Sequence, residues 1–334
     1  MHLDEVRTGL ERFVHDEFGA GARLADLQES DGHAGLTFLF AVREAGGTTG
    51  KYVIKLPPRG VRRRGNTDVY RQAPLLRALK ADGLPVPAVP FARDDETNPW
   101  FGLPFIVMER LPGHTFFVWD PAPGVPRDQP TCEHYWTQAV ETLAALHAFD
   151  WQARLPDWEA PVALADEITR WERIYAQAPE PAWITAAEAT ERALLDTLPD
   201  GAPVGLFHGD YQPGNCLYDG ARLRGVIDWE LSGIGAQLLD LGWLLMIADS
   251  TVWTPGWMPL HPPSGARITA LYTAARGSDG ADIPWYHALA NYRLACIACL
   301  NVKLHRKGQR HDPIWENNAR SVLPMFERAQ GLVA

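Results

Sequence analysis

The chain has 334 residues, of which 46% are hydrophobic and 22% are charged, and its net charge is −10. Four cysteines and irregularly placed glycines and prolines exclude a disulfide framework, a collagen-like chain and a low-complexity chain. The charged N-terminus does not resemble a secretory signal, and the longest apolar run, residues 238–248, is too short to cross a bilayer. We therefore expect a cytoplasmic protein with no membrane partner.

The negative charge is concentrated in the C-terminal two thirds of the chain. Residues 1–110 carry 15 basic and 15 acidic side chains, whereas residues 111–334 carry 16 basic and 26 acidic ones. Because nucleic acids bind to basic surfaces, this distribution predicts no nucleic-acid partner. An acidic surface would attract a cationic ligand, and it would equally serve to keep the protein soluble.

The N-terminal third is predicted to be rich in strands. After an amphipathic helix at the start, the β-rich runs 36–42 and 51–56 are joined by a glycine-rich connection and predict a hairpin. Residues 68–81 have a helical pattern that ends before three prolines, and residues 105–108 form a short apolar strand. We place a domain boundary after residue 110.

The rest of the chain, residues 111–334, is predicted to be a larger and mainly helical domain. Thr131 is a candidate cap for its first helix, and residues 157–200 and 265–334 have further helical periodicity. One β-rich insert, residues 204–229, interrupts the helices. The predicted fold class is therefore α+β, with a strand-rich N-terminal lobe and a helical C-terminal lobe.

The insert contains the residues that predict chemistry. Its sequence from Phe207 to Glu230 reads FHGDYQPGNCLYDGARLRGVIDWE, and the Asp-Gly pair in the middle is typical of a hairpin turn. Asp210 and Asn215 precede this hairpin and Asp228 follows it. We expect folding of the hairpin to bring these three side chains together at one end.

These residue types suit phosphoryl transfer. Mg²⁺ bound to a triphosphate prefers carboxylate and amide oxygens, which Asn215 and Asp228 supply, with Glu230 as a third candidate. Asp210 would orient an incoming hydroxyl and accept its proton, as the catalytic aspartate of kinases does. Each residue alone would be typical of a turn or a cap, so the prediction depends on their joint spacing.

The segments HGDYQPGNCLYD, GVIDWE and LLDLGWLL resemble the catalytic stretch of aminoglycoside phosphotransferase-like enzymes, the small-molecule branch of the protein-kinase-like fold. The resemblance covers most of residues 25–250. It is nearest to the branch with the kinase-like domains of some acyl-CoA dehydrogenases, because of Pro57-Pro58, the prolines between 85 and 90, and the stretch 102–110. The resemblance implies a small antiparallel-sheet lobe that binds nucleotide and a helical lobe with the catalytic loop and the substrate pocket.

The resemblance also implies roles for individual residues of the second lobe. Asp210 would be the catalytic base, and Asn215 with Asp228 would hold the metal. His208 and Asp240 would be structural residues that support the catalytic loop, Asp240 through hydrogen bonds.

In the first lobe, several residues are implied to contact the nucleotide. Lys55 lies in the middle of an apolar strand, in the place of the kinase lysine that pairs with phosphates. The turn that contains Gly32 and His33 would lay backbone N–H groups on the phosphates. The adenine ring would meet backbone groups of Glu109 and Leu111, which leaves both ATP and GTP open.

The partner of Lys55 departs from the family pattern. Where a glutamate usually follows on the next helix, this sequence has Gln72, which can accept a hydrogen bond but cannot form an ion pair. Asp68, one turn earlier, is the alternative partner. The missing glutamate also keeps open a second class of function, a nucleotide-binding protein that does not catalyse.

Two features disagree about the phosphate acceptor. Residues 157–200 hold 10 acidic and 3 basic side chains, which favours a cationic acceptor such as an aminoglycoside or another antibiotic-like compound. The branch with acyl-CoA dehydrogenases favours a hydroxyacyl-CoA or another metabolite, and the arginine-rich loop 59–64 could contact its phosphates. The sequence thus predicts an ATP-dependent, Mg²⁺-requiring O-phosphotransferase for a small-molecule hydroxyl, as a monomer or homodimer.

Overall fold

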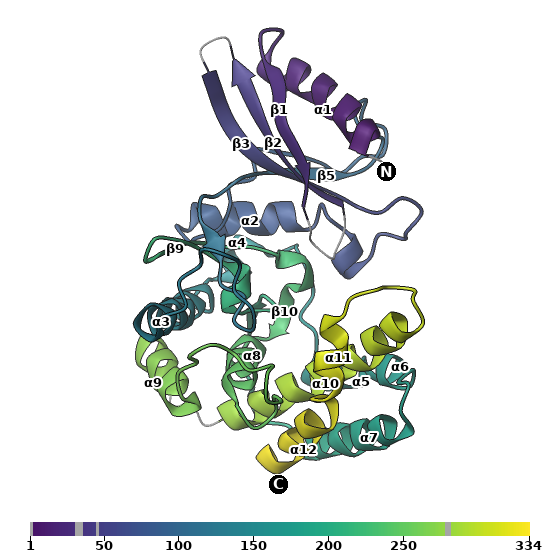
Figure 1. Ribbon diagram of the computed structural model, residues 1–334, viewed down its shortest axis with the longest axis vertical. Helices are drawn as coiled ribbons and strands as arrows, with labels where there is room; N and C mark the ends of the chain where they lie inside the picture. The colour runs from purple at the N-terminus through teal and green to yellow at the C-terminus, as the bar shows by residue number, and fades with distance from the viewer. Residues whose placement is uncertain (1–2, 31–35, 45–46, 278–281) are drawn as a thin grey trace. The chain divides into compact units, whose positions relative to one another are not determined.

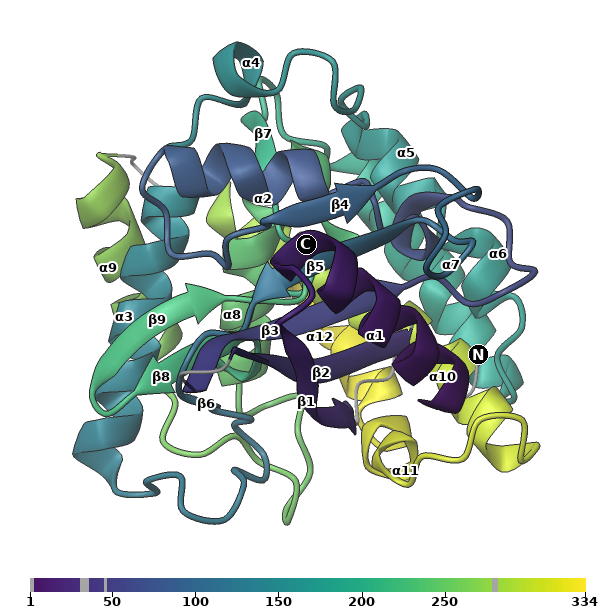
Figure 2. The ribbon, with the colours of Figure 1, turned by 90° about the horizontal axis from the view of Figure 1, so that it is seen from above.

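The computed structural model describes residues 3–30, 36–44, 47–277 and 282–334. The chain forms two compact units. The first unit comprises Met1–Gly113, Gln152–Trp158 and Arg224–Leu231, and the second comprises His114–Trp151, Glu159–Leu223 and Ser232–Ala334. Figures 1 and 2 show the helices and strands of both units in two perpendicular views.

The first unit is built on a five-stranded antiparallel sheet of order β1-β2-β3-β5-β4. The predicted hairpin and the predicted strand after residue 104 are confirmed as β2, β3 and β5, whereas β1 and β4 were not predicted. The elements of this unit are α1 (Leu3–Phe18), β1 (Arg23–Glu29), β2 (Leu36–Glu44), β3 (Gly47–Leu56), the 3₁₀ turn η1 (Gly65–Thr67), α2 (Gln72–Ala81), β4 (Phe91–Arg93), β5 (Phe105–Glu109) and the 3₁₀ turn η3 (Trp229–Leu231).

Helix α1 packs along this sheet, as Figure 1 shows, and the contact decides where Lys55 points. The apolar residues of α1 recur every three or four positions, so they form one stripe against the sheet. Ile54 and Leu56 of β3 are completely buried in this core. Because successive side chains of a strand point to opposite faces, Lys55 between them lies on the face of the sheet away from α1.

The second unit is mainly helical. Its elements are β6 (His114–Thr115), α3 (Gln129–Leu146), α5 (Leu164–Thr169), α6 (Glu172–Tyr175), α7 (Pro181–Asp196), β7 (Val204–Phe207), the 3₁₀ turn η2 (Pro213–Asn215), β8 (Cys216–Asp219), β10 (Gly233–Ala236), α8 (Leu239–Ala248), α9 (Gly265–Arg276), α10 (Ile283–Arg306), α11 (Ile314–Ala319) and α12 (Val322–Leu332). Two further elements, α4 (Trp151–Arg154) and β9 (Arg222–Val226), begin in the second unit and end in the first.

Helix α8 lies in the core of the second unit and packs against α10, which also contacts α7 and α12. Nearly every residue of α8 is buried, in agreement with its continuous apolar sequence. The two helices approach closely at Gly242, where an added Cβ would lie 2.1 Å from the carbonyl oxygen of Tyr286. The first turn of α8 therefore has no room for a side chain at position 242.

Replacing Gly242 with alanine is expected to destabilise the protein by about 3 kcal/mol, because the neighbouring backbone must move to make room. Urea unfolding at equilibrium measures the change. Gly331 in α12 is the matched control, since an added Cβ there meets nothing within 4 Å. Alanine at position 331 should leave the free energy of unfolding unchanged or raise it. Equal effects of the two substitutions would contradict the packing argument.

The predicted cap of α3 is wrong. Thr131 was the candidate, but the helix begins at Gln129 and Asp128 is its N-cap. The Asp128 backbone is extended, and its side chain accepts a hydrogen bond from the Thr131 N–H at 3.0 Å. Pro130 in the first turn is compatible with this start, because the first turn needs no N–H donor. The helix therefore starts earlier than its apolar periodicity suggests.

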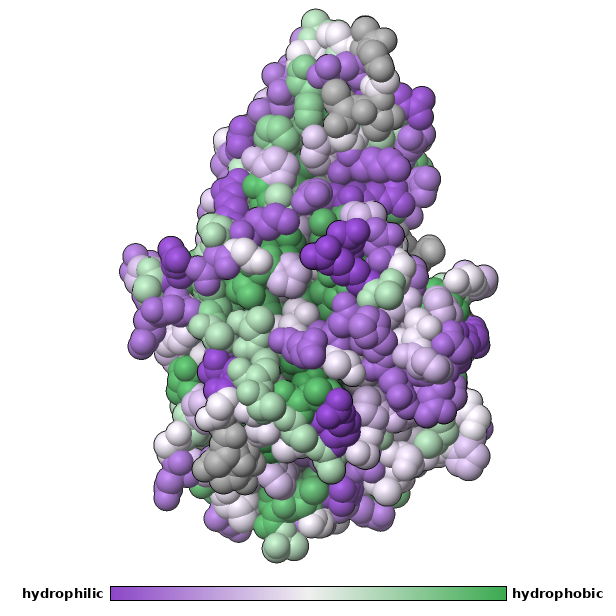
Figure 3. Space-filling model, turned by 90° about the vertical axis from the view of Figure 1, so that its left-hand side faces the viewer, coloured by the Kyte–Doolittle hydropathy of each residue, from purple (hydrophilic) through white to green (hydrophobic). Residues whose placement is uncertain are grey.

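The surface in Figure 3 mixes hydrophilic and hydrophobic residues, as is usual for globular proteins. The large apolar side chains with substantial exposure in the described ranges are few and separated in sequence: Leu3, Val61, Leu198, Val204 and Met258. In the same ranges, no helix has the length and apolar character needed to span a membrane.

Candidate active site

The loop that follows β7 carries Asp210, and it is fixed by the start of α8. β7 pairs antiparallel with β10, with Phe207 opposite Gly233, and β10 is followed directly by α8. Asp240 in the first turn of α8 is 1% exposed. Its carboxylate accepts hydrogen bonds from the backbone N–H of His208 at 2.6 Å and of Gly209 at 2.8 Å. This pair of bonds braces the loop immediately before Asp210.

Gly209 and His208 shape the same turn. The φ of Gly209 is +87°, in the left-handed region that favours glycine. Nδ1 of His208 accepts a hydrogen bond from the backbone N–H of Asp210 at 3.3 Å, and the imidazole is buried. His208 therefore stabilises the conformation of the loop through this hydrogen bond.

A second histidine, His147, lies behind Asp240 and was not predicted. Its Nε2 is 3.5 Å from Asp240 Oδ2, and its Nδ1 shares a hydrogen bond of 2.7 Å with the Tyr272 hydroxyl. Burial lowers the pKa of His147 below the usual value, in spite of the nearby carboxylate. The imidazole is therefore neutral at neutral pH, and its contact with Asp240 is not an ion pair. His147 lies 93 residues before Asp240 in the sequence, so only the folded structure could reveal this role.

The lowered pKa of His147 predicts a pH dependence of stability. Because the unfolded chain binds a proton near pH 6.5 and the folded chain does so only at lower pH, protonation favours unfolding. The free energy of unfolding should fall as the pH drops below about 6.5, by up to about 1.4 kcal/mol per pH unit for this group. Urea unfolding between pH 7.5 and 5 measures the slope, and His147→Gln should reduce it. An unchanged slope in that variant would refute the assignment.

The carboxylate of Asp210 is held by two side-chain amides. Oδ1 accepts a hydrogen bond from Gln212 Nε2 at 2.9 Å, and Oδ2 accepts one from Asn215 Nδ2 at 3.0 Å. Asn215 Nδ2 also donates to the backbone oxygen of Asp210 at 2.8 Å. The role of Gln212 was not predicted, although its position two residues after Asp210 is typical of such a local bond. Together the amides fix the direction in which the carboxylate points.

The same bonds orient the amide of Asn215 for a cation. Because its NH₂ group faces Asp210, its Oδ1 remains as an acceptor. An amide oxygen is a ligand of the type that Mg²⁺ takes, so this residue fits the predicted metal. Within the described ranges, no group of three or more His, Cys, Asp or Glu side chains is close enough to hold a metal ion.

In the first unit, Lys55 is paired with Asp228. Lys55 Nζ donates to Asp228 Oδ1 at 2.9 Å, and the lysine side chain is 14% exposed. Asp228 follows β9 and has a φ of +66°, which is uncommon for a residue other than glycine. Such backbone strain is typical of functional sites, where the surrounding structure holds it.

Asp228, and not Gln72 or Asp68, is thus the ion-pair partner of Lys55 in the structure. Asp68 instead accepts a hydrogen bond of 2.9 Å from Arg63. Gln72 is the first residue of α2 and is 2% exposed. The expected partner was wrong because the relevant carboxylate is 173 residues away in the sequence and is brought near by folding.

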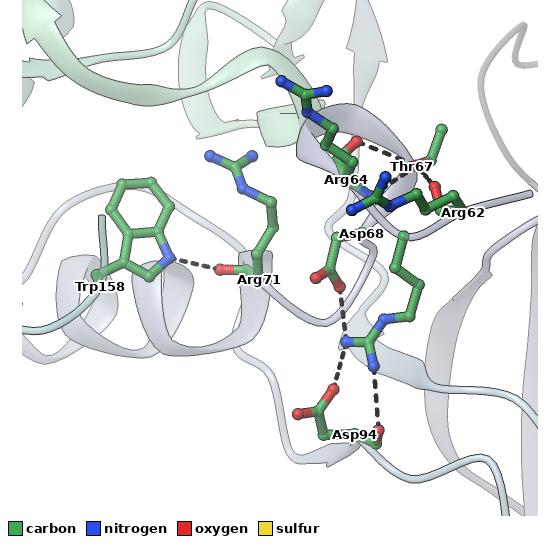
Figure 4. Close-up of polar contacts among 8 residues, drawn as sticks. Arg62, Arg64, Thr67, Asp68, Arg71, Asp94 and Trp158 are labelled. Atoms are coloured by element: carbon green, nitrogen blue, oxygen red, sulfur yellow. Dashed lines mark hydrogen bonds and ion pairs between the residues drawn. The ribbon is translucent and has the colours of Figure 1, made fainter. Parts of the chain in front are cut away.

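Figure 4 shows how the arginine-rich loop is built. Arg63 is its anchor, because its guanidinium pairs with both Asp68 and Asp94. Thr67 closes the loop: its hydroxyl donates to the Arg62 carbonyl at 2.8 Å and accepts from the Arg64 N–H at 3.0 Å. The side chains of Arg62 and Arg64 are exposed. The loop therefore presents two arginines from a fixed backbone.

Arg71 lies next to this loop and is also held in place, as Figure 4 shows. Its guanidinium lies over the Trp158 ring, 5.0 Å from the centroid, and the indole N–H donates to the Arg71 carbonyl at 2.8 Å. Arg71 Nη1 donates to the carbonyl of Glu230 at 3.1 Å. Because η1 also contacts η3, the positive charges lie near the segment that follows Asp228.

Glu109 and Leu111 are the residues expected to meet the adenine ring. The Glu109 N–H donates to the Ala88 carbonyl at 2.8 Å, which leaves the Glu109 carbonyl for a ligand. The Leu111 side chain covers Gly225, where an added Cβ would be 2.2 Å from Leu111 Cδ1. The predicted phosphate turn with Gly32 and His33 lies outside the described residues.

The predicted residues therefore form two groups. Lys55 and Asp228 are in contact in the first unit, while Asp210 and Asn215 are in contact in the second. The predicted assembly of all four around one metal and one nucleotide stays a prediction.

A sheet unit with a lysine on the face away from α1 and a helical unit with a braced His-Gly-Asp loop are typical of a protein-kinase-like phosphotransferase fold. Residues 33–278 match the model of the phosphotransferase enzyme family known as APH, and the chain belongs to this family. This family consists of phosphotransferase enzymes. The predicted fold class, family and enzyme class are confirmed.

Solved structures share this fold. The crystal structure of a putative aminoglycoside phosphotransferase from Ralstonia eutropha has a TM-score of 0.77 and 23% sequence identity, with 97% of each chain covered. The aminoglycoside phosphotransferase APH(4)-Ia, in a ternary complex with AMP-PNP and hygromycin B, has a TM-score of 0.60 and 16% identity, with 98% of each chain covered. At these sequence identities the similarity shows a shared fold and no more.

Some curated relatives are much longer than this chain, and others have a similar length. Acyl-CoA dehydrogenase family member 11 from Gallus gallus is 31% identical over 296 residues, which is 84% of this chain and 36% of the relative. The chain thus spans about a third of the length of such relatives. A homoserine kinase from Pseudomonas aeruginosa is 26% identical over 297 residues, which is 87% of this chain and 85% of the relative.

Proposed function

We propose that the protein transfers the γ-phosphate of ATP to a hydroxyl of a small molecule. The observation that carries the proposal is the carboxylate of Asp210, held by Gln212 and Asn215 on a braced loop. Asp210 accepts the proton of the acceptor hydroxyl while the oxygen forms a bond to the γ-phosphorus and the bond to the β-phosphate oxygen breaks. ADP and the phosphorylated acceptor leave.

The nucleotide is assigned to residues 1–110 and the acceptor to residues 111–334. Lys55 would contact the nucleotide phosphates, with Gly32, His33 and Gln72 nearby, and the carbonyl of Glu109 and the backbone of Leu111 would meet the adenine. Asn215, Asp228 and Glu230 would hold Mg²⁺, which when bound neutralises phosphate charge. The ion pair between Lys55 and Asp228 supports this assignment, because it already places a cation and a metal-type carboxylate side by side.

Replacing Asp228 with asparagine is expected to weaken Mg²⁺-dependent nucleotide binding by about tenfold or more, because the site loses a negative charge. Calorimetric titration with an ATP analogue, with and without Mg²⁺, measures the change. Asp82→Asn is the control, because Asp82 lies in the same unit and pairs with Arg154. If the Asp228 variant bound the nucleotide as the parent does, the metal role would be refuted.

An aminoglycoside or similar antibiotic is the first candidate acceptor. The acidic stretch 157–200 supports it, although the structure neutralises part of this charge. Glu167 pairs with Arg170 at 2.9 Å and lies 3.7 Å from Arg293, and Glu180 pairs with Arg306 at 3.0 Å. Fewer free carboxylates therefore remain for a cationic acceptor than the sequence suggests.

A metabolite is the second candidate, and the exposed side chains of Arg62 and Arg64 favour it. Two arginines on an anchored loop suit an acceptor that carries phosphate or carboxylate groups, such as a hydroxyacyl-CoA. The likeness to a homoserine kinase over most of that chain supports a small hydroxylated metabolite in the same way.

A panel of acceptors incubated with the protein, ATP and Mg²⁺ tests the function by mass spectrometry. The panel contains aminoglycosides, macrolides, choline-like alcohols, homoserine and hydroxyacyl-CoA esters, and Asp210→Ala is the control. A product that gains one phosphate and disappears in the variant supports the proposal and identifies the acceptor class. Nucleotide binding without turnover of any acceptor would favour a non-catalytic nucleotide-binding protein, and absence of both would refute the kinase assignment.

A further inference from the structure

A partly polar cavity lies in the helical unit, at the opposite end of α8 from Asp240. Its volume is about 370 Å³. The polar side chains that line it are Asp249, Ser250, Ser264, Thr269, His287 and Arg328, and Gly265 contributes backbone. Since α8 has ten residues, its length of about 15 Å separates this cavity from the braced catalytic loop. None of the residues with proposed roles in phosphoryl transfer lines the cavity.

His287 is the residue that indicates a ligand-binding site here. It is 8% exposed, and its Nε2 has no hydrogen-bond partner among the described residues. Nε2 is 3.6 Å from Asp249 Oδ2, which is too far for a hydrogen bond. Burial lowers the pKa of His287 to about 4, so the ring is neutral at neutral pH and this contact is not an ion pair. A buried ring nitrogen of this kind is costly unless something bonds to it.

Asp249 is already occupied by other donors. Its Oδ1 accepts hydrogen bonds from the backbone N–H and the hydroxyl of Thr251, at 3.0 and 2.6 Å. Its Oδ2 accepts one from Arg328 Nε at 2.7 Å. Arg328 neutralises the carboxylate, and its two terminal nitrogens remain as donors. The terminal nitrogens of Arg328 are therefore the charged donors that the cavity offers to a ligand.

Helix α9 adds further donors. Ser264 is its N-cap and accepts the N–H of Arg267 at 3.2 Å, and Gly265 is the first helical residue. Because the first N–H groups of a helix lack intrahelical partners and carry partial positive charge, they favour a negative group. Both Ser264 and Gly265 line the cavity, as does Arg328 of helix α12.

We infer that this cavity is a binding site for a small oxyanion, of the phosphate or carboxylate class. The anion would receive hydrogen bonds from the terminal nitrogens of Arg328, from His287 Nε2 and from the N-terminus of α9. This site is independent of the proposed kinase function, because binding there requires no nucleotide and no phosphoryl transfer.

Titration with inorganic phosphate in a chloride buffer of constant ionic strength, followed by calorimetry and by the phosphorus NMR line width, tests the inference. The parent protein should show saturable binding. Arg328→Met should weaken it by about tenfold or more, because a charge-assisted hydrogen bond is lost. Asp249→Asn should strengthen it, because a neighbouring negative charge is removed. Acetate that displaces phosphate would show a general oxyanion site, and acetate that does not would show a phosphate site.

A matched pair of variants tests the histidine. Gln retains a nitrogen donor near the position of Nε2, whereas Leu removes it and keeps the packing volume. We expect His287→Leu to weaken phosphate binding and His287→Gln to retain it. Circular dichroism and Tm confirm that each variant is folded, and Arg7→Met in the other unit controls for loss of a positive charge.

Two results would overturn the inference. The first is absence of saturable phosphate binding in the parent protein, or parent-like affinity in both Arg328→Met and His287→Leu. The second is loss of binding in Lys55→Met with no change in Arg328→Met, since the anion would then occupy the phosphate position of the nucleotide. Retained phosphate binding in Asp210→Ala and Lys55→Met, together with loss in Arg328→Met, supports the new site even if no acceptor is ever phosphorylated.

Discussion

Replacing Asp210 with alanine is expected to lower kcat by about 10³-fold while leaving the affinity for nucleotide nearly unchanged. The loss follows because the acceptor hydroxyl no longer has a carboxylate that orients it and takes its proton. Single-turnover kinetics measure the chemical step, and calorimetry with an ATP analogue measures nucleotide binding. A kcat within a factor of a few of the parent value would show that Asp210 is not the base.

Two variants make this test specific. Asp196→Asn removes one exposed carboxylate from α7 in the same unit and should leave kcat unchanged. Gln212→Ala removes one of the two amides that hold Asp210 and should lower kcat by about tenfold, because the carboxylate keeps its charge but loses one fixed hydrogen bond. A Gln212 variant with parent activity would show that Asn215 alone is sufficient to orient the base.

Replacing Asp240 with asparagine is expected to have the second large effect. The buried carboxylate accepts two backbone N–H groups, and an amide can accept only one of them while its own NH₂ faces the other. Leaving such a buried donor unsatisfied costs about 1–3 kcal/mol. We therefore expect kcat to fall by about 10²-fold through displacement of the loop, with lower stability of the whole protein.

Hydrogen exchange distinguishes this positioning role from a general loss of stability. The amides of His208 and Gly209 should exchange much faster in Asp240→Asn than in the parent, beyond the change in global stability. Gly242→Ala, which destabilises the same helix without touching these amides, is the matched control. Equal acceleration in both variants would mean that Asp240 acts only through the fold.

Several features of the site could be read from the sequence because they are local. The alternation of Ile54, Lys55 and Leu56 places the lysine on the face of the strand away from the core. The spacing from Asp210 to Asn215 allows the amide to reach back to the carboxylate across a single 3₁₀ turn. In both places the geometry of a strand or a turn follows from backbone periodicity alone.

Other features appear only when distant segments pack together. Asp228 meets Lys55 from 173 residues away, and no rule of spacing selects it over the nearer Asp68. The N-cap of α3 is Asp128 and not Thr131, because hydrogen-bond geometry, not apolar periodicity, sets a helix end.

Local sequence patterns were sufficient to predict the class of the protein, the residue types of the proposed catalytic loop and the local structure around them. Packing of distant segments was needed to show which carboxylate pairs with Lys55, that His147 lies behind Asp240, and that Asp249, His287 and Arg328 share one cavity. The physical reason is the same in each instance. Periodicity and turn chemistry act over a few residues, whereas partners from separate elements are selected by the packing of helices and strands into a core.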